Sequence, residues 1–256
     1  MTDPQPSMHD HVKHGDTLIT VTGVSKIFKL REEKVYALRD VNVEIFRGEY
    51  LSIMGPSGSG KSTLFNIIGA LDRPSEGSAR IGPLDLTKLT SRQLAYVRCN
   101  YIGYIFQAYN LIASLTAVKN VALPAVFQGK TPDEADQKAA EVLTAVGLGH
   151  RLDHRPDELS GGQQQRVAIA RALVNDPTII LADEPTANLD LKTGSDIIAL
   201  LKQLCTERGV TVITATHDHK MLVNSDRVLW IKQGQVEKIE RVADMDIEVG
   251  GIEFGH

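Results

Sequence analysis

The chain carries the stretch Gly55-Pro56-Ser57-Gly58-Ser59-Gly60-Lys61-Ser62 between a short apolar run and a helical pattern. The run Tyr50 to Met54 predicts a strand and the pattern Leu64 to Leu71 predicts a helix, so the expected order is strand, loop, helix. Glycines let backbone N–H groups turn inward around a phosphate, and the positive end of the new helix points at the same anion. The stretch therefore matches the phosphate-binding loop in full.

The last residues of this loop are expected to carry the chemistry of ATP binding. Lys61 is placed to reach the β- and γ-phosphates, and the Ser62 hydroxyl is placed to ligate Mg²⁺. The expected nucleotide-binding set begins at Gly55 and ends at Thr63. ATP and Mg²⁺ are thus the predicted ligands.

A second apolar strand, Ile179 to Ala182, ends in the adjacent carboxylates Asp183 and Glu184. Ligands of parallel sheets sit at the carboxyl ends of the strands. Asp183 can then hold Mg²⁺ through water, and Glu184 can polarise the attacking water as general base. An Asp-Glu pair after a strand is more often a solvated turn, but a phosphate loop upstream reverses that expectation because the magnesium needs a carboxylate.

The stretch Leu159-Ser160-Gly161-Gly162-Gln163 precedes another helical pattern. Ser160 and Gln163 have the spacing of a capping box, which would explain these two residues as an ordinary helix start. Two glycines in the first turn weaken a helix and make sense if a phosphate approaches the helix start closely. The chain is therefore expected to carry a second anion site.

The remaining pattern predicts an α/β fold built around these motifs. Alternation over Leu18 to Gly23 and over Ala37 to Phe46 predicts an antiparallel region near the N-terminus. The segment Ser91 to Leu173 is mainly helical, with a helix from Glu134 to Val146. The alternation of apolar strands with helices after it predicts a mostly parallel sheet. The strands are Ile179 to Ala182 and Val210 to Ala215, and the helix between them is Lys192 to Cys205.

Composition and charge set further limits. The 256 residues are 42% apolar and 23% charged, an ordinary composition for a globular chain. The net charge of −4 gives no basic footprint, so nucleic acid is not an expected partner. Cys99 and Cys205 lie far apart and are expected to be reduced thiols. The apolar stretch Val118 to Phe127 is interrupted by Lys119, Asn120 and Pro124, so no membrane span is expected and the chain should stay in the cytoplasm.

Both ends are expected to lie outside the folded domain. Residues 1–16 are polar and include three closely spaced histidines, for which no complete metal site is apparent. The expected domain spans residues 17–238, with its helical subdomain at about 91–173. Residues 239–256 carry acids among apolar residues, and for the segment after Gly234 an extra strand and a solvated tail both remain open, with the tail slightly favoured.

Taken with the phosphate loop and Asp183-Glu184, the stretch Leu159 to Gln163 resembles the signature of the ATP-binding subunits of ABC transporters, over roughly Leu18 to Gly234. The resemblance implies that two copies pair head to tail, so that each ATP lies between the phosphate loop of one copy and Ser160 to Gln163 of the other. The family motifs follow in order. They are Gln107 as the Q-loop, Ala187-Asn188-Leu189-Asp190 as the D-loop and His217 as the switch histidine.

The resemblance also assigns roles to single residues. Gln107 would contact Mg²⁺ or water and link the ATP site to the membrane partner. His217, which follows the strand Val210 to Ala215, would lie beside Asp183, and Asp190 would join the nucleotide site. Phe28 stands where the family usually stacks an aromatic ring on adenine. A place in the strand core is nearly as probable for Phe28, and Tyr36 is the alternative.

Finer resemblance points to the branch of lipoprotein-release, macrolide-efflux and related mechanotransmission ATPases. It rests on Gly77 to Thr90, Asn110 to Pro124, Leu143 to Arg155 and Asn66 to Asp72. Its members drive a separate permease, and a periplasmic adaptor can join through that permease. This places the chain on the inner face of the cell membrane. The permease is expected to dock beside Gln107, on an apolar surface made by Tyr109, Leu111, Ile112 and Leu115.

Two other functions are alternatives to that of a transporter subunit. Soluble ABC ATPases that act on DNA or ribosomes usually carry two modules, long coiled coils or zinc cysteines, and none of these is visible in the sequence. A non-hydrolysing regulatory subunit would be expected to lack Glu184 or His217, and both are present. The transported substrate is not readable from this chain.

Overall fold

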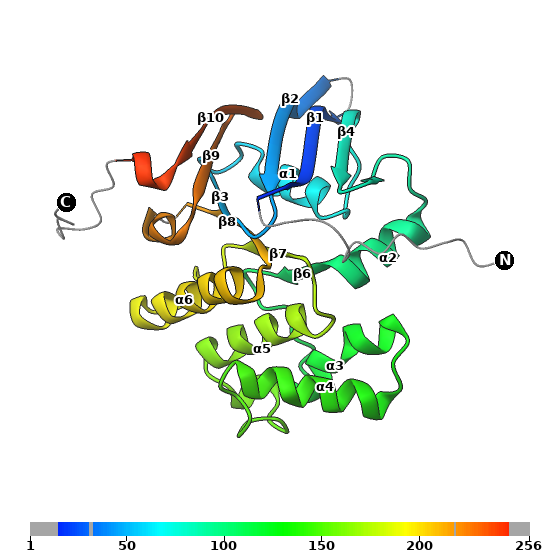
Figure 1. Ribbon diagram of the computed structural model, residues 1–256, viewed down its shortest axis with the longest axis vertical. Coiled ribbons are helices and arrows are strands. Elements are labelled where there is room, and N and C mark those ends of the chain that lie inside the picture. The colour runs from blue at the N-terminus through cyan, green and yellow to red at the C-terminus, as the bar shows by residue number, and fades with distance from the viewer. Residues whose placement is uncertain (1–14, 31–32, 218, 246–256) are drawn as a thin grey trace.

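The computed structural model describes residues 15–30, 33–217 and 219–245. Two sheets occupy one half of the molecule and a group of helices the other half (Figure 1). The α/β fold class predicted from the sequence is confirmed, including the antiparallel region near the N-terminus and the mostly parallel sheet.

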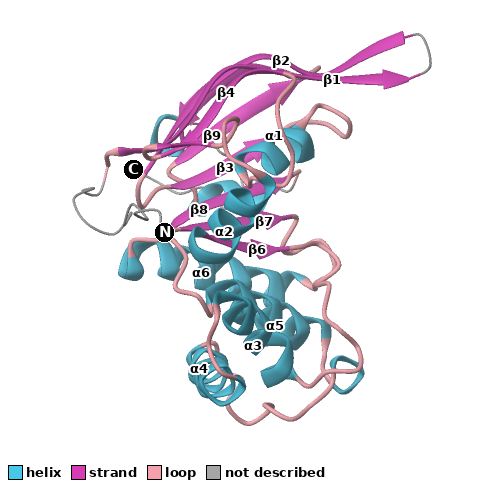
Figure 2. Ribbon diagram, turned by 90° about the vertical axis from the view of Figure 1, so that its right-hand side faces the viewer, coloured by secondary structure: helices cyan, strands magenta, loops and turns pink. Residues whose placement is uncertain are grey.

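The first sheet is antiparallel, with the strand order β2-β1-β4-β5. Its strands are β1 (Thr17–Leu30), β2 (Glu33–Phe46), β4 (Glu76–Ile81) and β5 (Leu84–Asp85). The second half of β2 alternates between exposed and buried residues, as a strand with one face on a core should. The far ends of β1 and β2 project beyond the rest of the sheet (Figure 2).

The second sheet has the order β10-β9-β3-β8-β7-β6 and is parallel except for the pair of β10 with β9. Its strands are β3 (Tyr50–Met54), β6 (Ile102–Ile105), β7 (Ile179–Asp183), β8 (Thr211–Thr216), β9 (Arg227–Lys232) and β10 (Gln235–Arg241). Every residue of β3 and β8 is buried, because helices and the first sheet cover both faces.

Six α-helices complete the described fold. They are α1 (Lys61–Ile68), α2 (Ser91–Tyr101), α3 (Ala117–Gln128), α4 (Pro132–Ala145), α5 (Gly161–Leu173) and α6 (Leu191–Arg208). Short 3₁₀ helices occur at Pro156–Glu158, His219–Asn224 and Val242–Asp244.

Two large apolar clusters lie on opposite faces of the parallel sheet. Along β7 and β8 alternate residues belong to different clusters: Leu181 and Ile213 face the cluster of the antiparallel sheet, whereas Ile180 and Val212 face the cluster of α3, α4 and α5. This alternation follows from the two-residue period of a strand. The central strands therefore join the two halves of the molecule.

The predicted helical segment 91–173 needs a correction. Strand β6 interrupts it and pairs in parallel with β7, so these residues belong to the sheet. Helix α2 packs through Leu94, Val97 and Tyr101 on the cluster of the antiparallel sheet, not on the helical cluster. The helical subdomain consequently begins after β6.

The ends of the domain also differ from the expectation. The strand begins at Thr17 as predicted, and residues 1–14 of the predicted N-terminal tail lie outside the described residues. The predicted boundary at residue 238 falls inside β10, because Gln235–Arg241 pairs with β9. The strand alternative therefore holds directly after Gly234, and residues 246–256 lie outside the described residues.

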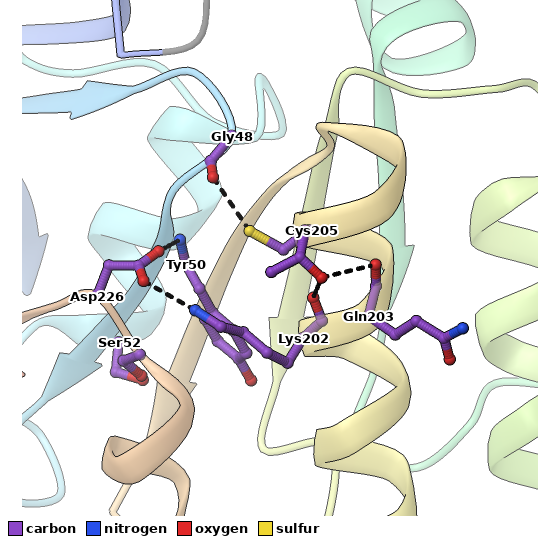
Figure 3. A network of polar contacts seen from close by, with 9 residues as sticks. Gly48, Tyr50, Ser52, Lys202, Gln203, Cys205 and Asp226 are labelled. Carbon is purple, nitrogen blue, oxygen red and sulfur yellow. Dashed lines mark hydrogen bonds and ion pairs between the residues drawn. The ribbon is translucent and has the colours of Figure 1, made fainter.

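A polar network ties α6 to the start of β3 (Figure 3). The Asp226 carboxylate accepts hydrogen bonds from the Tyr50 backbone N–H and the Lys202 ammonium, both at 2.8 Å. The Cys205 thiol donates to the Gly48 carbonyl oxygen at 3.2 Å, and burial raises the pKa of this thiol to about 11. Cys99 and Cys205 are both free, so the network fixes the strand that leads into the glycine-rich loop without a disulfide.

Candidate nucleotide-binding and catalytic site

One cavity of about 520 Å³ collects about half of the site residues that the sequence singled out. It opens where α1 begins and where β7 and β8 end. Its lining residues are Ala37, Ser57, Gly58, Gly60, Lys61, Ser62, Thr63, Asp183, Glu184 and His217. Segments separated by more than a hundred residues thus face one space, at the carboxyl edge of a parallel sheet where ligands bind.

Two glycines of the loop are required by close backbone contacts. A side chain on Gly55 would collide with the Ile231 carbonyl oxygen, and a Cβ on Gly60 would lie 2.6 Å from the Ala37 carbonyl oxygen. Gly60 also has φ 108°, a conformation that side chains rarely adopt. The loop is therefore held against β2 and β9 in a shape that only glycine permits.

Helix α1 begins without a side-chain cap. Its N-cap residue is Gly60, which is left-handed and accepts no hydrogen bond through a side chain. The first N–H groups of a helix have no partner inside the helix, and they carry the positive end of its dipole. The start of α1 is therefore suited to bind an anion.

The Lys61 ammonium lies along the loop. It donates to the carbonyl oxygens of Gly55 at 2.6 Å and Pro56 at 3.0 Å. The pKa of Asp183 is raised, first by desolvation and then by the neighbouring Glu184 carboxylate. The Lys61 positive charge lowers it, but by less. A cation next to Asp183 would remove this penalty on its charged form.

Glu184 and His217 form a pair at the ends of β7 and β8. The Glu184 Oε1 atom lies 2.7 Å from His217 Nδ1, and the Glu184 side chain is 22% exposed whereas that of His217 is 69% exposed. Glu184 has φ 45°, which is rare for a residue with a long side chain, and its N–H donates to the Ala215 carbonyl oxygen. Backbone strain of this kind concentrates at functional sites.

The residues of the cavity fit a magnesium ion held with a nucleotide. Ser62 and Asp183 offer oxygen ligands, which Mg²⁺ prefers. Within the described residues no cluster of three or more His, Cys, Asp or Glu could hold a metal ion alone. Mg²⁺ commonly takes one or two carboxylates plus substrate phosphates, so this sparse oxygen set suits it.

The two aromatic candidates for adenine stacking lie on opposite faces of the β1–β2 pair. Phe28 pairs with Val35, and Tyr36 pairs with Ile27, so the neighbouring positions point to opposite sides. Phe28 is 44% exposed and Tyr36 is 39% exposed, and neither lines the cavity. One face of the Tyr36 ring is already covered by the Arg39 guanidinium, 4.4 Å from the ring centroid.

The predicted second anion site lies outside the cavity. Ser160 is the N-cap of α5, where its hydroxyl accepts from the Gln163 N–H and the Gln163 side chain accepts from the Ser160 N–H. A side chain on Gly162 would collide with Thr193, whereas one on Gly161 would lie 3.1 Å from the Tyr109 hydroxyl. The predicted capping box is present, and both glycines lie close to side chains of this same chain; the approach of a phosphate to this helix start remains a prediction.

Gln107 of the Q-loop and Asp190 of the D-loop also do not line the cavity. Gln107 is exposed, and its carbonyl oxygen accepts from the Asn188 amide at 2.9 Å. Asp190 is the N-cap of α6, where its carboxylate accepts from Lys192 N–H, Thr193 N–H and the Thr193 hydroxyl. These Thr193 hydrogen bonds lower the pKa of Asp190. Roles of Gln107 and Asp190 toward ATP remain predictions.

Sequence reasoning missed three supports of the site. The Gly234 N–H donates to the Ser59 carbonyl oxygen at 2.8 Å, so the β9–β10 turn braces the glycine-rich loop. Arg171 and Asn188 hold the backbone of residues 107–110. All three act through carbonyl oxygens, which every residue carries, so no side-chain pattern in the sequence could reveal the bonds.

Comparisons with known proteins agree with this geometry. Residues 38–187 match the family described as ABC transporter. The chain is 44% identical to the lipoprotein-releasing system ATP-binding protein LolD of Shewanella oneidensis, over 87% of this chain and 96% of LolD. It is 46% identical to the macrolide export ATP-binding/permease protein MacB of a Shewanella species, over 88% of this chain but only 34% of MacB.

A solved structure gives the same result. The ATP-binding cassette MJ0796 of Methanocaldococcus jannaschii, described as a dimer in a post-hydrolysis state bound to ADP and phosphate, superimposes with a TM-score of 0.82. It is 47% identical and covers 88% of this chain and 99% of its own. With the phosphate loop, the paired carboxylates and the signature helix in place, the chain belongs to the ATP-hydrolysing ATP-binding subunits of the ABC transporter family.

Proposed function

We propose that two copies of this chain close head to tail around two ATP molecules and drive a membrane permease. The observation that carries the proposal is the separation of two helix starts. The start of α1 lies in the cavity with Asp183, Glu184 and His217, whereas the start of α5 does not line it. Both views place α1 and α5 in different parts of the molecule (Figure 1 and Figure 2). A second copy would bring its own α5 to this cavity.

In the proposed mechanism the start of α1 and Lys61 bind the phosphates of ATP. Ser62, Asp183 and Gln107 would hold Mg²⁺, which supplies charge neutralisation on the β- and γ-phosphates. Glu184 accepts a proton from the attacking water, and His217 fixes the Glu184 carboxylate through the 2.7 Å contact. Ser160, Gly161 and Gly162 of the second copy close the site and exclude water.

Replacing Glu184 by Gln tests the assigned base. The amide keeps the size of the side chain but cannot accept the proton, so turnover should fall by about 10²–10⁴-fold while ATP binding persists. The variant should accumulate as an ATP-bound dimer, which size-exclusion chromatography with scattering would detect. Hydrolysis near the wild-type rate would remove Glu184 from the mechanism.

The permease is proposed to dock in a second cavity, of about 540 Å³, between α2, β6, α3 and α5. Its lining includes Leu71, Tyr96, Phe106, Pro124, Phe127 and Arg171. Phe127 is 78% exposed, and Leu71 and Tyr96 are also exposed, which is unusual for large apolar side chains gathered at one place. MacB is named an ATP-binding/permease protein, and this supports a permease as the partner.

This cavity differs from the surface expected from the sequence. None of Tyr109, Leu111, Ile112 and Leu115 lines it. Leu111 packs on the helical cluster, and the buried Asn120 amide donates to the Ile112 and Leu115 carbonyl oxygens, so these residues form a fixed loop. Ile112 alone among the four is a large exposed apolar residue.

A pair of substitutions compares the two surfaces. Phe127→Asp should abolish co-purification with the permease and permease-stimulated hydrolysis, because a carboxylate would be buried against an apolar partner. Ile112→Asp is the matched control and should leave both intact, and each isolated variant should still bind ATP. The opposite result would return the docking site to the loop around Ile112.

The proposed permease partner determines where the chain lies in the cell. No helix within residues 15–30, 33–217 and 219–245 has the length and apolar character that crossing a membrane requires. We propose that the chain sits on the cytoplasmic face of the membrane through its permease. A periplasmic adaptor would join this assembly only through the permease. Fractionation with and without the permease would test the attachment.

A further inference from the structure

The loop after Gln107 has an uncommon backbone. Tyr109 has φ 58° and Asn110 has φ 51°, so two consecutive residues with side chains are left-handed. Asparagine tolerates this conformation, but tyrosine rarely adopts it. Asn110 is exposed, so burial of its side chain does not fix the loop. Local backbone bonds, from the Tyr109 N–H to the Phe106 carbonyl oxygen and from the Asn110 N–H to the Ala108 carbonyl oxygen, are joined by contacts from elsewhere in the chain.

Arg171 on α5 supplies these contacts. Its Nη2 donates to the Tyr109 carbonyl oxygen at 2.7 Å, and its Nη1 donates to the Asn110 carbonyl oxygen. The planar guanidinium has two parallel donors in fixed geometry, which lysine lacks. Within the described part of the chain no carboxylate forms an ion pair with Arg171. The guanidinium is therefore committed to the two carbonyl oxygens of this loop.

Two further contacts fix the loop, one from the D-loop and one at the start of α5. The Asn188 amide, which lies in the D-loop, donates to the Gln107 carbonyl oxygen at 2.9 Å. The Tyr109 side chain reaches the start of α5, since a Cβ on Gly161 would lie 3.1 Å from its hydroxyl. The loop thus touches the signature helix near its first turn and again at Arg171. Arg171 also lines the cavity proposed for the permease.

We propose that Arg171 is a positioning residue that makes the Gln107–Asn110 loop move together with α5. The inference rests on the proposed pairing of two copies, in which the start of α5 meets the ATP of the partner. When α5 shifts toward that phosphate, its grip on Tyr109 and Asn110 carries the Gln107 side chain toward the cavity of Ser62 and Asp183. Hydrolysis then depends on Arg171, whereas ATP binding by the isolated chain does not.

Arg171→Lys tests this assignment, with Arg166→Lys as matched control. Lysine keeps the charge but loses the fork, so kcat should fall about 10–100-fold, the range that misplacement of a catalytic group gives, with ATP affinity unchanged. Arg166 lies on the same helix and donates to the Val146 carbonyl oxygen at 3.0 Å, at the end of α4. Its replacement should change neither quantity.

A second readout does not use activity. Hydrogen exchange of the backbone amides of residues 106–112 should accelerate in Arg171→Lys and stay at the wild-type rate in Arg166→Lys. Asn110→Gly changes an exposed position, so the fold is not at risk, and it should also loosen the loop and lower kcat. Unchanged exchange and unchanged kcat in both loop variants would overturn the proposal.

A double-mutant cycle with Gln107→Ala separates positioning from a general structural role. If Arg171 acts through Gln107, Arg171→Lys should lower kcat no further in the Gln107→Ala background. Additive losses would contradict the proposal. Failure of the proposed pairing would show differently, as absence of ATP-dependent dimers in Glu184→Gln itself, before any change at Arg171.

Discussion

The starts of α1 and α5 are the two helix N-termini that we propose to meet phosphate, and they begin in different ways. At α1 the N-cap is Gly60, and no side chain occupies the first N–H groups. At α5 the hydroxyl of Ser160 already accepts from the N–H of Gln163. The first site is open to an anion within its own subunit, whereas the second is closed by its own capping box. A capped α5 can therefore fold stably within one copy, before the proposed pairing brings a phosphate of the other copy to it.

The largest effect on hydrolysis is expected when the two sites are inactivated in different chains. Lys61→Ala damages the α1 site and Ser160→Arg blocks the α5 site, so each homodimer should lose hydrolysis by about 100-fold or more. In a heterodimer of the two variants, one composite site keeps both wild-type residues. Hydrolysis should recover to about half of the wild-type rate per dimer, because a two-fold dimer has two equivalent sites.

Purified heterodimers, isolated with two different affinity tags, are the material for this measurement. Homodimers of each variant serve as controls. If proven heterodimers show no recovery, the sites are not shared between chains, and the separation of α1 from α5 would need another explanation.

A smaller effect is expected from removing only the cap of α5. Ser160→Ala should lower the free energy of unfolding by about 1 kcal/mol and slow hydrolysis several-fold. Thr131→Ala is the control, since Thr131 forms the same capping box with Glu134 at the start of α4. It should cost similar stability without slowing hydrolysis. Equal kinetic losses in both variants would make Ser160 an ordinary cap.

The smallest effect concerns the charge that faces α1. Desolvation and Glu184 raise the pKa of Asp183, so the folded protein holds that proton more tightly than the unfolded chain. Stability from this group is present at low pH and is lost as the pH rises through the folded pKa. Asp183→Asn should therefore raise the Tm of the nucleotide-free protein by a few degrees at neutral pH, and the gain should vanish in acid.

Asp190→Asn should change the Tm in the opposite direction and lower it at neutral pH. Hydrogen bonds from Thr193 lower the pKa of Asp190, so its contribution is present above the unfolded pKa and lost as the pH falls through the folded pKa. Calorimetry of both variants between about pH 2 and 8, which extends below the ordinary carboxyl range, would compare them. A lower Tm for Asp183→Asn at neutral pH would contradict the raised pKa.

Features fixed by local pattern could be predicted from the sequence. The strand, glycine loop and helix around Lys61 follow from short-range periodicity and from glycine, and Asp183 and Glu184 follow an unbroken apolar strand. The cavity confirms that these segments come together. The resemblance to a known family, not the spacing, supplied Gln107, Asp190 and Phe28, and the roles of these three remain predictions.

Features fixed by distant contacts could not be predicted. Helix α2 looks like part of the helical insert, yet its apolar face packs on the antiparallel sheet. Strand β6 is short and carries Gly103, whose missing side chain makes room for the Ala172 carbonyl oxygen of α5. The docking cavity combines residues from four elements, so exposure of Phe127 appears only after folding.

The strand order has a consequence for the time course of folding during synthesis. Strand β3, which leads into the glycine-rich loop, pairs only with β8 and β9, and Ser52 meets Thr214 in that register. At roughly 5–20 residues per second, a ribosome would make β8 about 8–32 s after β3. The antiparallel sheet can form early from nearby segments, but β3 stays unpaired until the chain is nearly complete. A premature stop after α5 would therefore leave both edges of β3 exposed to aggregation.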